Sequence, residues 1–340
     1  MQQPVDTYAS GNTTSLSTFH TLRLLPEHSV ILFSTLNISV FLVGVFGNVL
    51  TLLLIAKSTT MRRSIHLYTF NLCISDLFIL LFFVPTQVVS LNDDLRWTIG
   101  ADMCRVSYVV IPTSLMTTIG TLLSISVDRA RGLVKPFQWR ASSRKTAKRL
   151  IPALWIFAVL VSSPLFFVVR LTDFGDGTMI CAEEWPSQRA KFYYWLSCFV
   201  FSYAVPLFII FVIQVLLVYT IKFKVQNRAF RKQNKRMANM TVAIVVVFAL
   251  CTGMQHILFF LVHFSIEMTK GTFLALYCTS SFVIILQAAS NPFIYGKFRG
   301  DFKRGYKKLL QDLLVWRTKR YMQATAGSSM MDNKSDAADM

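Results

Sequence analysis

Seven long apolar stretches dominate this 340-residue chain and limit what it can fold into. They cover residues 30–56, 67–91, 106–127, 150–169, 192–221, 240–264 and 272–295. A helix needs about 20 mostly apolar residues to cross a bilayer core, where unpaired backbone groups are not tolerated. A large soluble helical bundle would instead carry charges every few residues on the wet face of each helix, and these stretches contain almost none. The sequence therefore predicts an all-α membrane protein, a seven-transmembrane helix bundle.

The domain organisation follows from the same stretches, which with their short connections use nearly all of the chain. We expect an extracellular tail over residues 1–29, the seven-transmembrane domain over 30–296, an amphipathic membrane-surface helix over 297–315 and a disordered cytoplasmic tail over 316–340. Residues 1–25 are polar and lack the apolar segment of a cleavable signal peptide. The first span is therefore predicted to act as the insertion signal.

Charge predicts the sidedness of the bundle. Lys and Arg gather in residues 57–63, 131–149, 222–236 and 297–308, which alternate with connections rich in acids. Basic connections stay on the cytoplasmic side, so the N-terminus is expected outside and the C-terminus inside. The net charge of +18 might indicate a nucleic-acid protein, but the cations form collars at one membrane face. Anionic lipids and an acidic cytoplasmic partner explain them more simply, and no nucleic acid is expected.

The outer connections hold two of the six cysteines, Cys104 and Cys181. The other four fall within or near spans and are expected to be buried thiols. On the oxidising side, a disulfide between Cys104 and Cys181 would pin the loop after span four over the mouth of the bundle. Residues 175–177 of that loop read Gly-Asp-Gly, a turn signal that predicts a short β-hairpin. Asn12, in an Asn-Thr-Thr sequon on the outer tail, is a predicted glycosylation site.

A series of short motifs occurs in order along the spans. They are Gly47-Asn48-Val49-Leu50, Ser75-Asp76-Leu77, Cys104, Asp128-Arg129, Trp155, Pro206, Phe248 with Cys251, and Asn291-Pro292-Phe293-Ile294-Tyr295. On these residues the chain resembles the rhodopsin-like (class A) G-protein-coupled receptors over nearly its whole length. The resemblance implies a multi-pass plasma membrane receptor that binds an extracellular ligand and activates a heterotrimeric G protein through helix rearrangement.

Asp76 lies within an apolar span, where a carboxylate needs partners facing the bundle interior. Asn48, Thr118 and Asn291 are the nearest candidates. In the family such a cluster binds a sodium ion that favours the inactive state, and oxygen ligands suit a hard cation. An allosteric sodium ion at Asp76, Thr118 and Asn291 is therefore one prediction, with no other cofactor expected. A neutral Asp76 in a purely structural hydrogen-bond network is the alternative.

Asp128 and Arg129 end span three on the cytoplasmic side. The resemblance implies that Asp128 holds Arg129 until the C-terminal helix of a G protein displaces it. Ala130 and Asn234 stand where relatives often carry a tyrosine and an acid, so we expect a weak resting pair. The alternative is a structural role, in which Arg129 only extends its charged group toward the lipid headgroups.

Further activation residues are implied in spans three, five, six and seven. Pro292 lets span seven bend, and Tyr295 can swing inward when the helices rearrange. Pro206, Ile119 and Phe248 resemble the packing switch of the family, although ordinary core packing would also place them there.

Span six departs from the family. Most relatives read Cys-Trp-x-Pro where this chain reads Cys251-Thr252-Gly253-Met254, so the usual indole and proline are missing. In span five, Gln214 stands where a tyrosine normally meets the displaced arginine. These departures leave open an atypical receptor that binds a ligand or a partner receptor without efficient G-protein coupling.

Two residues that other receptors use to bind their ligands are absent here, and this narrows the possible class of ligand. Ile111 stands where amine receptors carry an aspartate, and Ile285 where opsins carry the retinal lysine. An acidic outer surface with a hairpin lid suits a peptide, particularly a basic one. Local sequence resembles neuropeptide receptors of the galanin, allatostatin, somatostatin and neuropeptide FF kind. The predicted lining residues are Gln87, Ile111, Thr252, Gln255, His256, Phe259 and Gln287. His256 is expected to be a hydrogen-bonded pocket residue, with a proton switch as the alternative.

After span seven, apolar residues recur at helical spacing between basic ones: Phe298, Phe302, Tyr306, Leu309, Leu310 and Leu313. This pattern predicts a helix lying on the inner leaflet and contacting membrane lipids. Ser328, Ser329 and Ser335 are candidate phosphorylation sites for arrestin. A transporter would show repeated halves and several intramembrane charges, and a membrane enzyme a catalytic constellation within the spans. The sequence shows neither, so no catalytic residues are predicted.

Overall fold

Long helices make up most of the computed structural model, which describes residues 26–58, 63–93, 96–173, 178–263, 268–309 and 311. Their bounds are α1 Glu27–Lys57, α2 Ser64–Asn92, α3 Ala101–Val134, α4 Pro136–Val168, α5 Gln188–Phe199, α6 Val205–Phe223, α7 Arg228–His263 and α8 Lys270–Phe298. A π-helical turn, η3 (Val200–Ala204), joins α5 to α6. These three pieces form one span, so the described residues contain seven helices long and apolar enough to cross a membrane. The predicted seven-helix bundle is confirmed.

Lipid contact explains why so many apolar side chains lie on the surface. Only 17% of the most apolar window of α4 is buried inside the protein, against 56% for α2. Phe157 of α4, Phe208 of α6 and Leu250 of α7 are all more than half exposed. In water such faces would drive association, whereas hydrocarbon solvates them as well as a protein core does.

Several boundaries differ from those expected. The first helix begins at Glu27 rather than residue 30, directly after Pro26, which can precede a helix but not continue one. Span four begins at Pro136 rather than 150, because proline suits the first turn of a helix and the basic residues that follow are good helix formers. The cations expected in a loop there lie instead on a helical extension of α4.

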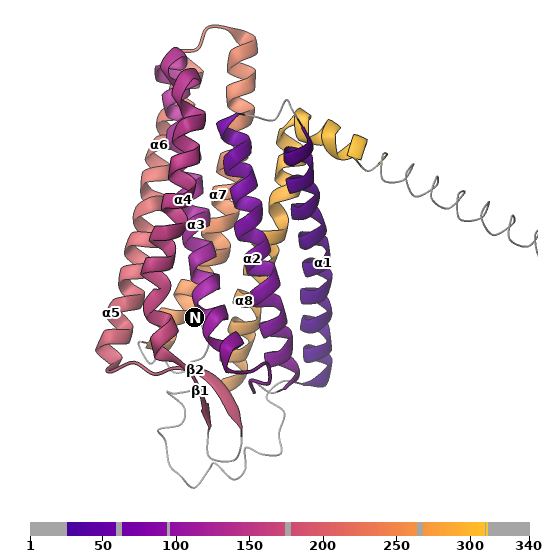
Figure 1. Cartoon of the computed structure of the whole chain (residues 1–340), viewed down its shortest axis with the longest axis vertical. Coiled ribbons are helices and arrows are strands. Elements are labelled where there is room, and N and C mark those ends of the chain that lie inside the picture. Colours follow the sequence, from indigo (N-terminus) through magenta and orange to yellow (C-terminus); the bar gives the residue numbers. More distant parts are fainter. Residues whose placement is uncertain are drawn as a thin grey trace, which may run out of the picture.

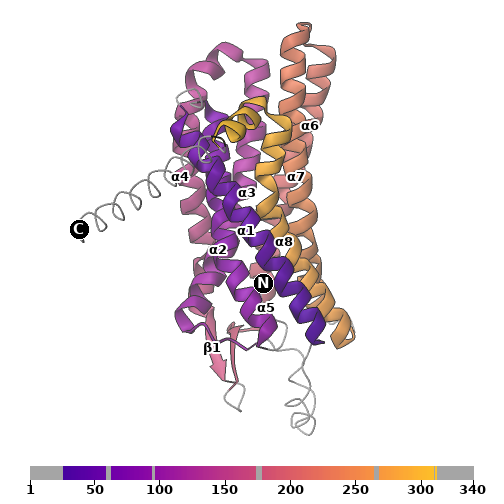
Figure 2. The ribbon, with the colours of Figure 1, turned by 90° about the vertical axis from the view of Figure 1, so that its right-hand side faces the viewer.

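The helices run side by side, with α3 in the interior of the bundle (Figure 1). It contacts α2, α4, α6 and α7. Figures 1 and 2 both place α1 beside α2 and α8. Gly44 permits the close approach of α1 to α8, since a Cβ at that position would lie 2.8 Å from the Ala289 Cβ.

A β-hairpin covers one end of the bundle, which we call the hairpin end (Figure 1). Strand β1 (Val169–Asp173) pairs antiparallel with β2 (Met179–Glu183), with Leu171 opposite Cys181. Cys104, in the first turn of α3, forms a disulfide with Cys181, with their Cα atoms 5.7 Å apart. The predicted hairpin and disulfide are therefore both present. The turn at 175–177, like Asn12, lies outside the described residues.

The opposite end, which we call the basic end, is where α4 and α7 begin and α8 ends. Arg144, Lys148, Arg231 and Lys232 are exposed there. Arg299 interrupts the helix, which resumes over residues 300–309 and turns away from α8 (Figure 1).

The segment 300–309 is amphipathic, and it begins after α8 ends at Phe298 rather than at the expected residue 297. Phe302 is buried and Tyr306 half-buried, with the Tyr306 hydroxyl 2.8 Å from that of Thr51. The basic residues between them, Lys303, Arg304, Lys307 and Lys308, are exposed. Leu310 and Leu313 lie outside the described residues.

Candidate functional site

A pocket opens between α2, α3, α5, η3, α7 and α8 in the hairpin-side half of the bundle. The empty space between its walls, including the opening to solvent, is about 690 Å³. Its lining residues are Phe83, Tyr108, Ile111, Pro112, Leu115, Met116, Trp195, Cys198, Ser202, Tyr203, Phe248, Thr252, Gln255, His256 and Ile284. None of these described residues is Asp, Glu, Lys or Arg. The floor of the pocket therefore suits uncharged and aromatic groups.

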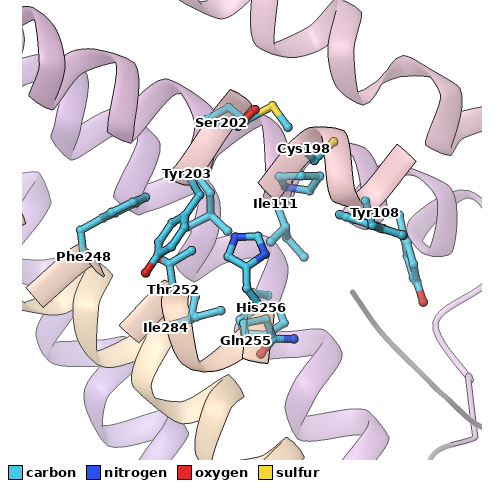
Figure 3. Close-up of a pocket in the computed structure, with 15 residues that line it drawn as sticks. Tyr108, Ile111, Cys198, Ser202, Tyr203, Phe248, Thr252, Gln255, His256 and Ile284 are labelled. Carbon is cyan, nitrogen blue, oxygen red and sulfur yellow. The ribbon is translucent and has the colours of Figure 1, made fainter. Parts of the chain in front are cut away.

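Four of the seven predicted lining residues face this pocket: Ile111, Thr252, Gln255 and His256. Figure 3 shows His256 and Gln255 approaching from α7 and Ile111 from α3. The Thr252 hydroxyl is buried and finds no hydrogen-bond partner in the part of the chain that the structure describes. It is therefore available to a ligand or a water molecule.

The other three predicted residues lie outside the pocket wall. Gln87 is buried and donates a hydrogen bond to the Tyr277 hydroxyl at 3.1 Å. The Phe259 ring lies 5.9 Å from that of Trp195, behind the wall rather than in it. Gln287 is buried, and neither polar atom of its side chain has a partner within the described ranges.

The hairpin is tied to the pocket wall through Glu183 of β2. Its Oε2 accepts hydrogen bonds from Trp185 Nε1 at 2.7 Å and Trp195 Nε1 at 3.0 Å, and Lys191 Nζ lies 3.8 Å away. Burial raises the pKa of Glu183, whereas the positive charge of Lys191 and the two indole donors act to lower it, and the pKa lies below its usual range. Sequence reasoning missed this network, because nothing in the spacing of two tryptophans indicates a shared acceptor.

Asp76 of α2 is fully buried and contacts α8. Asn291 Nδ2 donates to its Oδ2 at 2.7 Å, whereas its Oδ1 has no partner among the described residues. Thr118 Oγ1 and Asn48 Oδ1 are also buried and without hydrogen bonds there. Orphaned oxygens are rare in protein interiors, so this set fits a small hard cation or water. No group of three or more His, Cys, Asp or Glu side chains suited to another metal occurs in the described residues.

Asp128 and Arg129 lie at the basic end of α3 and form an ion pair, with Arg129 Nη2 3.1 Å from Asp128 Oδ2. Asp128 also accepts hydrogen bonds from the Trp139 indole at 2.9 Å and the Ser64 hydroxyl at 3.0 Å. The Arg129 guanidinium lies 5.4 Å from the centroid of the Trp139 ring. Asn234 donates to the carbonyl of Phe230 in its own helix. Trp139 and Ser64, which sequence reasoning missed, thus hold the pair together.

The remaining predicted activation residues occupy the middle of the bundle. Ile119 and Phe248 belong to one buried cluster, against which Tyr203 packs, and Pro206 is half-buried beside it at the start of α6. Tyr295 is fully buried with its hydroxyl unpartnered among the described residues, and its ring lies 5.6 Å from that of Phe302. Pro292 lies inside α8 one turn before Tyr295.

A charged cluster fastens the segment 300–309 to α2. His66 Nε2 lies 3.2 Å from Asp301 Oδ2, and Arg299 Nε donates to Asp301 Oδ1 at 3.1 Å. Burial raises the pKa of Asp301, but its bonds with His66 and Arg299 lower that pKa below its usual range. The cluster fixes where the chain turns after α8.

Comparison with known proteins adds a family and several relatives. The model of the 7 transmembrane receptor (rhodopsin family) matches residues 47–295. The pyroglutamylated RF-amide peptide receptor of Mus musculus is 27% identical over 337 residues, covering 91% of this chain and 77% of that receptor. The galanin receptor type 1 of Homo sapiens is 28% identical over 283 residues, covering 80% and 79%. The neuropeptide FF receptor 1 of Rattus norvegicus is 25% identical over 341 residues, covering 92% and 78%.

Proposed function

We propose that this chain, which belongs to the rhodopsin family of seven-transmembrane receptors, binds an extracellular peptide and activates a heterotrimeric G protein. Membership of the family confirms the resemblance carried by the motifs. It also makes the chain a multi-pass receptor of the plasma membrane rather than an enzyme. The names of its relatives support a neuropeptide as the ligand.

One observation carries the proposal. Helix α3 contributes Ile111 to the pocket and, five turns further on, Arg129 to the basic end. Between these two points, Ser126 accepts a hydrogen bond from Gln214 of α6, and Ile119 shares a buried cluster with Phe248 of α7. A ligand that shifts α3 against those helices would therefore alter the environment of the Asp128–Arg129 pair. The uncharged lining of the pocket suits the aromatic or amidated part of a peptide, while the exposed acidic side chains at the hairpin end, Asp102, Asp173 and Glu184, suit its basic residues.

The orientation is part of the proposal. The exposed cations of the basic end support a cytoplasmic location for it, and the disulfide supports an extracellular location for the hairpin. In that orientation Arg129 faces a G protein, the amphipathic segment 300–309 rests on anionic inner-leaflet lipids, and the C-terminal tail can offer Ser328, Ser329 and Ser335 for arrestin binding after phosphorylation.

We also propose that Asp76, Thr118 and Asn291, helped by Asn48, hold a sodium ion. The buried oxygens of Asp76, Thr118 and Asn48, which have no hydrogen-bond partner among the described residues, support this role. When bound, the cation would neutralise the Asp76 carboxylate and favour the resting packing in which Asp128 holds Arg129.

The test is guanine-nucleotide exchange on purified heterotrimers of the main Gα classes. The peptides are those named by the relatives: pyroglutamylated RF-amide peptide, galanin, neuropeptide FF and neuromedin U. We expect exchange with at least one peptide, abolished by Arg129→Ala and retained in Arg131→Ala, an exposed arginine on the same helix. His256→Ala should weaken peptide binding, whereas Ile257→Ala, which is 61% exposed, should not.

The second candidate is a receptor that binds a ligand or a partner receptor without efficient coupling. Gln214 favours it, because it replaces the tyrosine that normally meets the displaced arginine, and its side-chain amide N–H already donates to Ser126 on α3 at 3.2 Å. Ala130, Thr252 and Met254 are the other departures from the family. Peptide binding without exchange on any heterotrimer would select this candidate. Absence of both binding and exchange would contradict the peptide ligand.

A further inference from the structure

The missing indole and proline of α7 leave open how this receptor could pass a ligand signal from the pocket to its core. Thr252 and Met254 occupy those two positions. Thr252 has no ring to pack against Phe248, which itself lines the pocket, and Met254 does not interrupt the helix. An aromatic ring on the neighbouring span packs there instead.

Tyr203 lies on the π-helical turn η3, directly before α6. The turn is closed by a hydrogen bond from the Val205 N–H to the Val200 carbonyl, five residues back. Pro206 explains its place, because proline has no N–H to offer the Ser202 carbonyl four residues earlier. A π-turn adds one residue to the helix and so rotates the residues before it by about 100°. Such turns occur often at functional sites.

The Tyr203 ring connects the pocket to the core. It lines the pocket, and its centroid lies 4.8 Å from that of His256, which also lines the pocket. On its other side, its centroid lies 6.5 Å from that of Phe248 in the buried cluster. Figure 3 shows the Tyr203 ring between those of Phe248 and His256. A ligand group that pushes on His256 or on this ring would therefore displace Phe248 through direct contact.

The Tyr203 hydroxyl also binds the backbone of α7. It donates to the Ala249 carbonyl at 2.6 Å, the carbonyl that a regular helix pairs with the amide of Gly253. The absence of a side chain at 253 makes this approach possible, since a Cβ there would lie 2.5 Å from the hydroxyl oxygen. This bond ties η3 to α7 at the turn that ends at Gly253, one residue before Met254, where relatives have a proline.

We propose that Tyr203 is the ligand-sensing residue of this receptor. From its place on span five, it performs the role of the indole that α7 lacks. Its ring transmits ligand contact to Phe248, and its hydroxyl holds α7 in the arrangement in which Asp128 pairs with Arg129. The inference rests on the proposed function, because it assumes that the pocket is where the ligand acts.

Tyr203→Phe tests the hydroxyl and Tyr203→Leu tests the ring. Losing one neutral hydrogen bond changes an equilibrium by about twofold to tenfold, so we expect Tyr203→Phe to raise ligand-independent nucleotide exchange by that factor. Tyr203→Leu is expected to lower the maximal exchange produced by the active peptide at least fivefold while changing its affinity less than threefold. Tyr219→Phe is the matched control, because Tyr219 lies on α6 with 54% of its surface exposed.

Gly253→Ala tests the contact itself. The added methyl group must displace the Tyr203 hydroxyl, so this variant should raise basal exchange as Tyr203→Phe does. The double variant should then equal Tyr203→Phe alone, since the hydroxyl can be lost only once. Additive effects of the two substitutions would overturn the proposal.

A fluorophore on Arg236→Cys, an exposed position near the basic end of α7, reports movement of that helix without a G protein. The free cysteines among the described residues are buried or half-buried and leave this label selective. If the wild-type receptor shows no exchange, the proposed function fails, yet the fluorescence still decides the role of Tyr203. Emission and exchange in Tyr203→Phe that match Tyr219→Phe would contradict it.

Discussion

Two buried carboxylates, Glu183 at the hairpin end and Asp76 in the middle of the bundle, have opposite surroundings. Glu183 at the hairpin end has two indole donors and an ammonium group on a single oxygen. Asp76, in mid-bundle, has one amide donor and an oxygen with no partner among the described residues. A fully satisfied charge fixes its neighbours, whereas an under-satisfied one makes alternative arrangements accessible. The comparison indicates that the β1–β2 hairpin forms a rigid cover above a core that can repack.

The largest expected effect comes from opening the cover with Cys104→Ser. The disulfide closes a loop across 77 residues, and in the chain-entropy model such a loop stabilises by about 4.5 kcal/mol. The gain is smaller for helices that stay inserted in the membrane when they separate. We expect more than a tenfold loss of peptide binding per receptor at the cell surface, measured by flow cytometry with a labelled peptide. Cys251→Ser, at a half-buried free thiol, is the control. Unchanged binding in Cys104→Ser would show that the Glu183 network suffices to hold the hairpin.

Next in size is the loss of the Glu183 charge. Because its pKa is lower in the folded protein than its ordinary value of 4.5, Glu183 stabilises the fold above that value and this contribution disappears as the pH falls through the lowered pKa. Glu183→Gln should therefore lower the melting temperature by several degrees at pH 7, the effect of losing about 1.5–3 kcal/mol, and should flatten the decline of stability in acid. Glu184→Gln, at the half-exposed neighbouring residue, is expected to change neither quantity. Equal melting temperatures for the two variants would remove Glu183 as the anchor of the cover.

Removing the charge of Asp76 is expected to have a moderate effect on how sodium changes the affinity for the peptide. If Asp76 holds sodium, raising NaCl should lower peptide affinity of the wild type by about fivefold, within the usual range of coupling free energies. Asp76→Asn should lose that response, and Thr118→Ala should weaken it. The measurement is radioligand competition with N-methylglucamine chloride replacing NaCl at constant ionic strength. A sodium response that persists in Asp76→Asn would place the ion elsewhere, and no response in the wild type would favour the structural network.

The same contrast explains what the sequence could predict. The seven spans, the disulfide and the hairpin follow from hydropathy, charge sidedness and a Gly-Asp-Gly turn, which are local features. The Asp76–Asn291 contact was also predictable, because a charge in mid-membrane must find a polar partner. Features that depend on how the helices are rotated and packed could not be predicted from the sequence.

Three residues illustrate the limit. Phe259 and Gln87 were expected in the pocket, but Phe259 packs behind Trp195 and Gln87 bonds Tyr277. Tyr203 was not predicted at all, since the π-turn that faces it toward α7 leaves no mark in the sequence beyond Pro206. One inserted residue changes the phase of a helix, and every prediction of which side chains face the pocket depends on that phase.

The smallest expected effect concerns the basic end, where the Asp128–Arg129 pair is held by Trp139. Trp139→Phe keeps a ring beside the Arg129 guanidinium but removes the N–H that donates to Asp128 at 2.9 Å. Asp128 retains the Ser64 donor, so basal nucleotide exchange should rise only about twofold to threefold. Gln138→Ala, at the exposed neighbouring residue, should leave exchange unchanged. Ser64→Ala combined with Trp139→Phe should raise it further, since Arg129 would then be the last partner of the carboxylate among the described residues. If the double variant were no more active than the wild type, the restraint on Arg129 would have to come from the mid-bundle core, and the contrast between a fixed cover and a movable interior would extend over the whole length of α3.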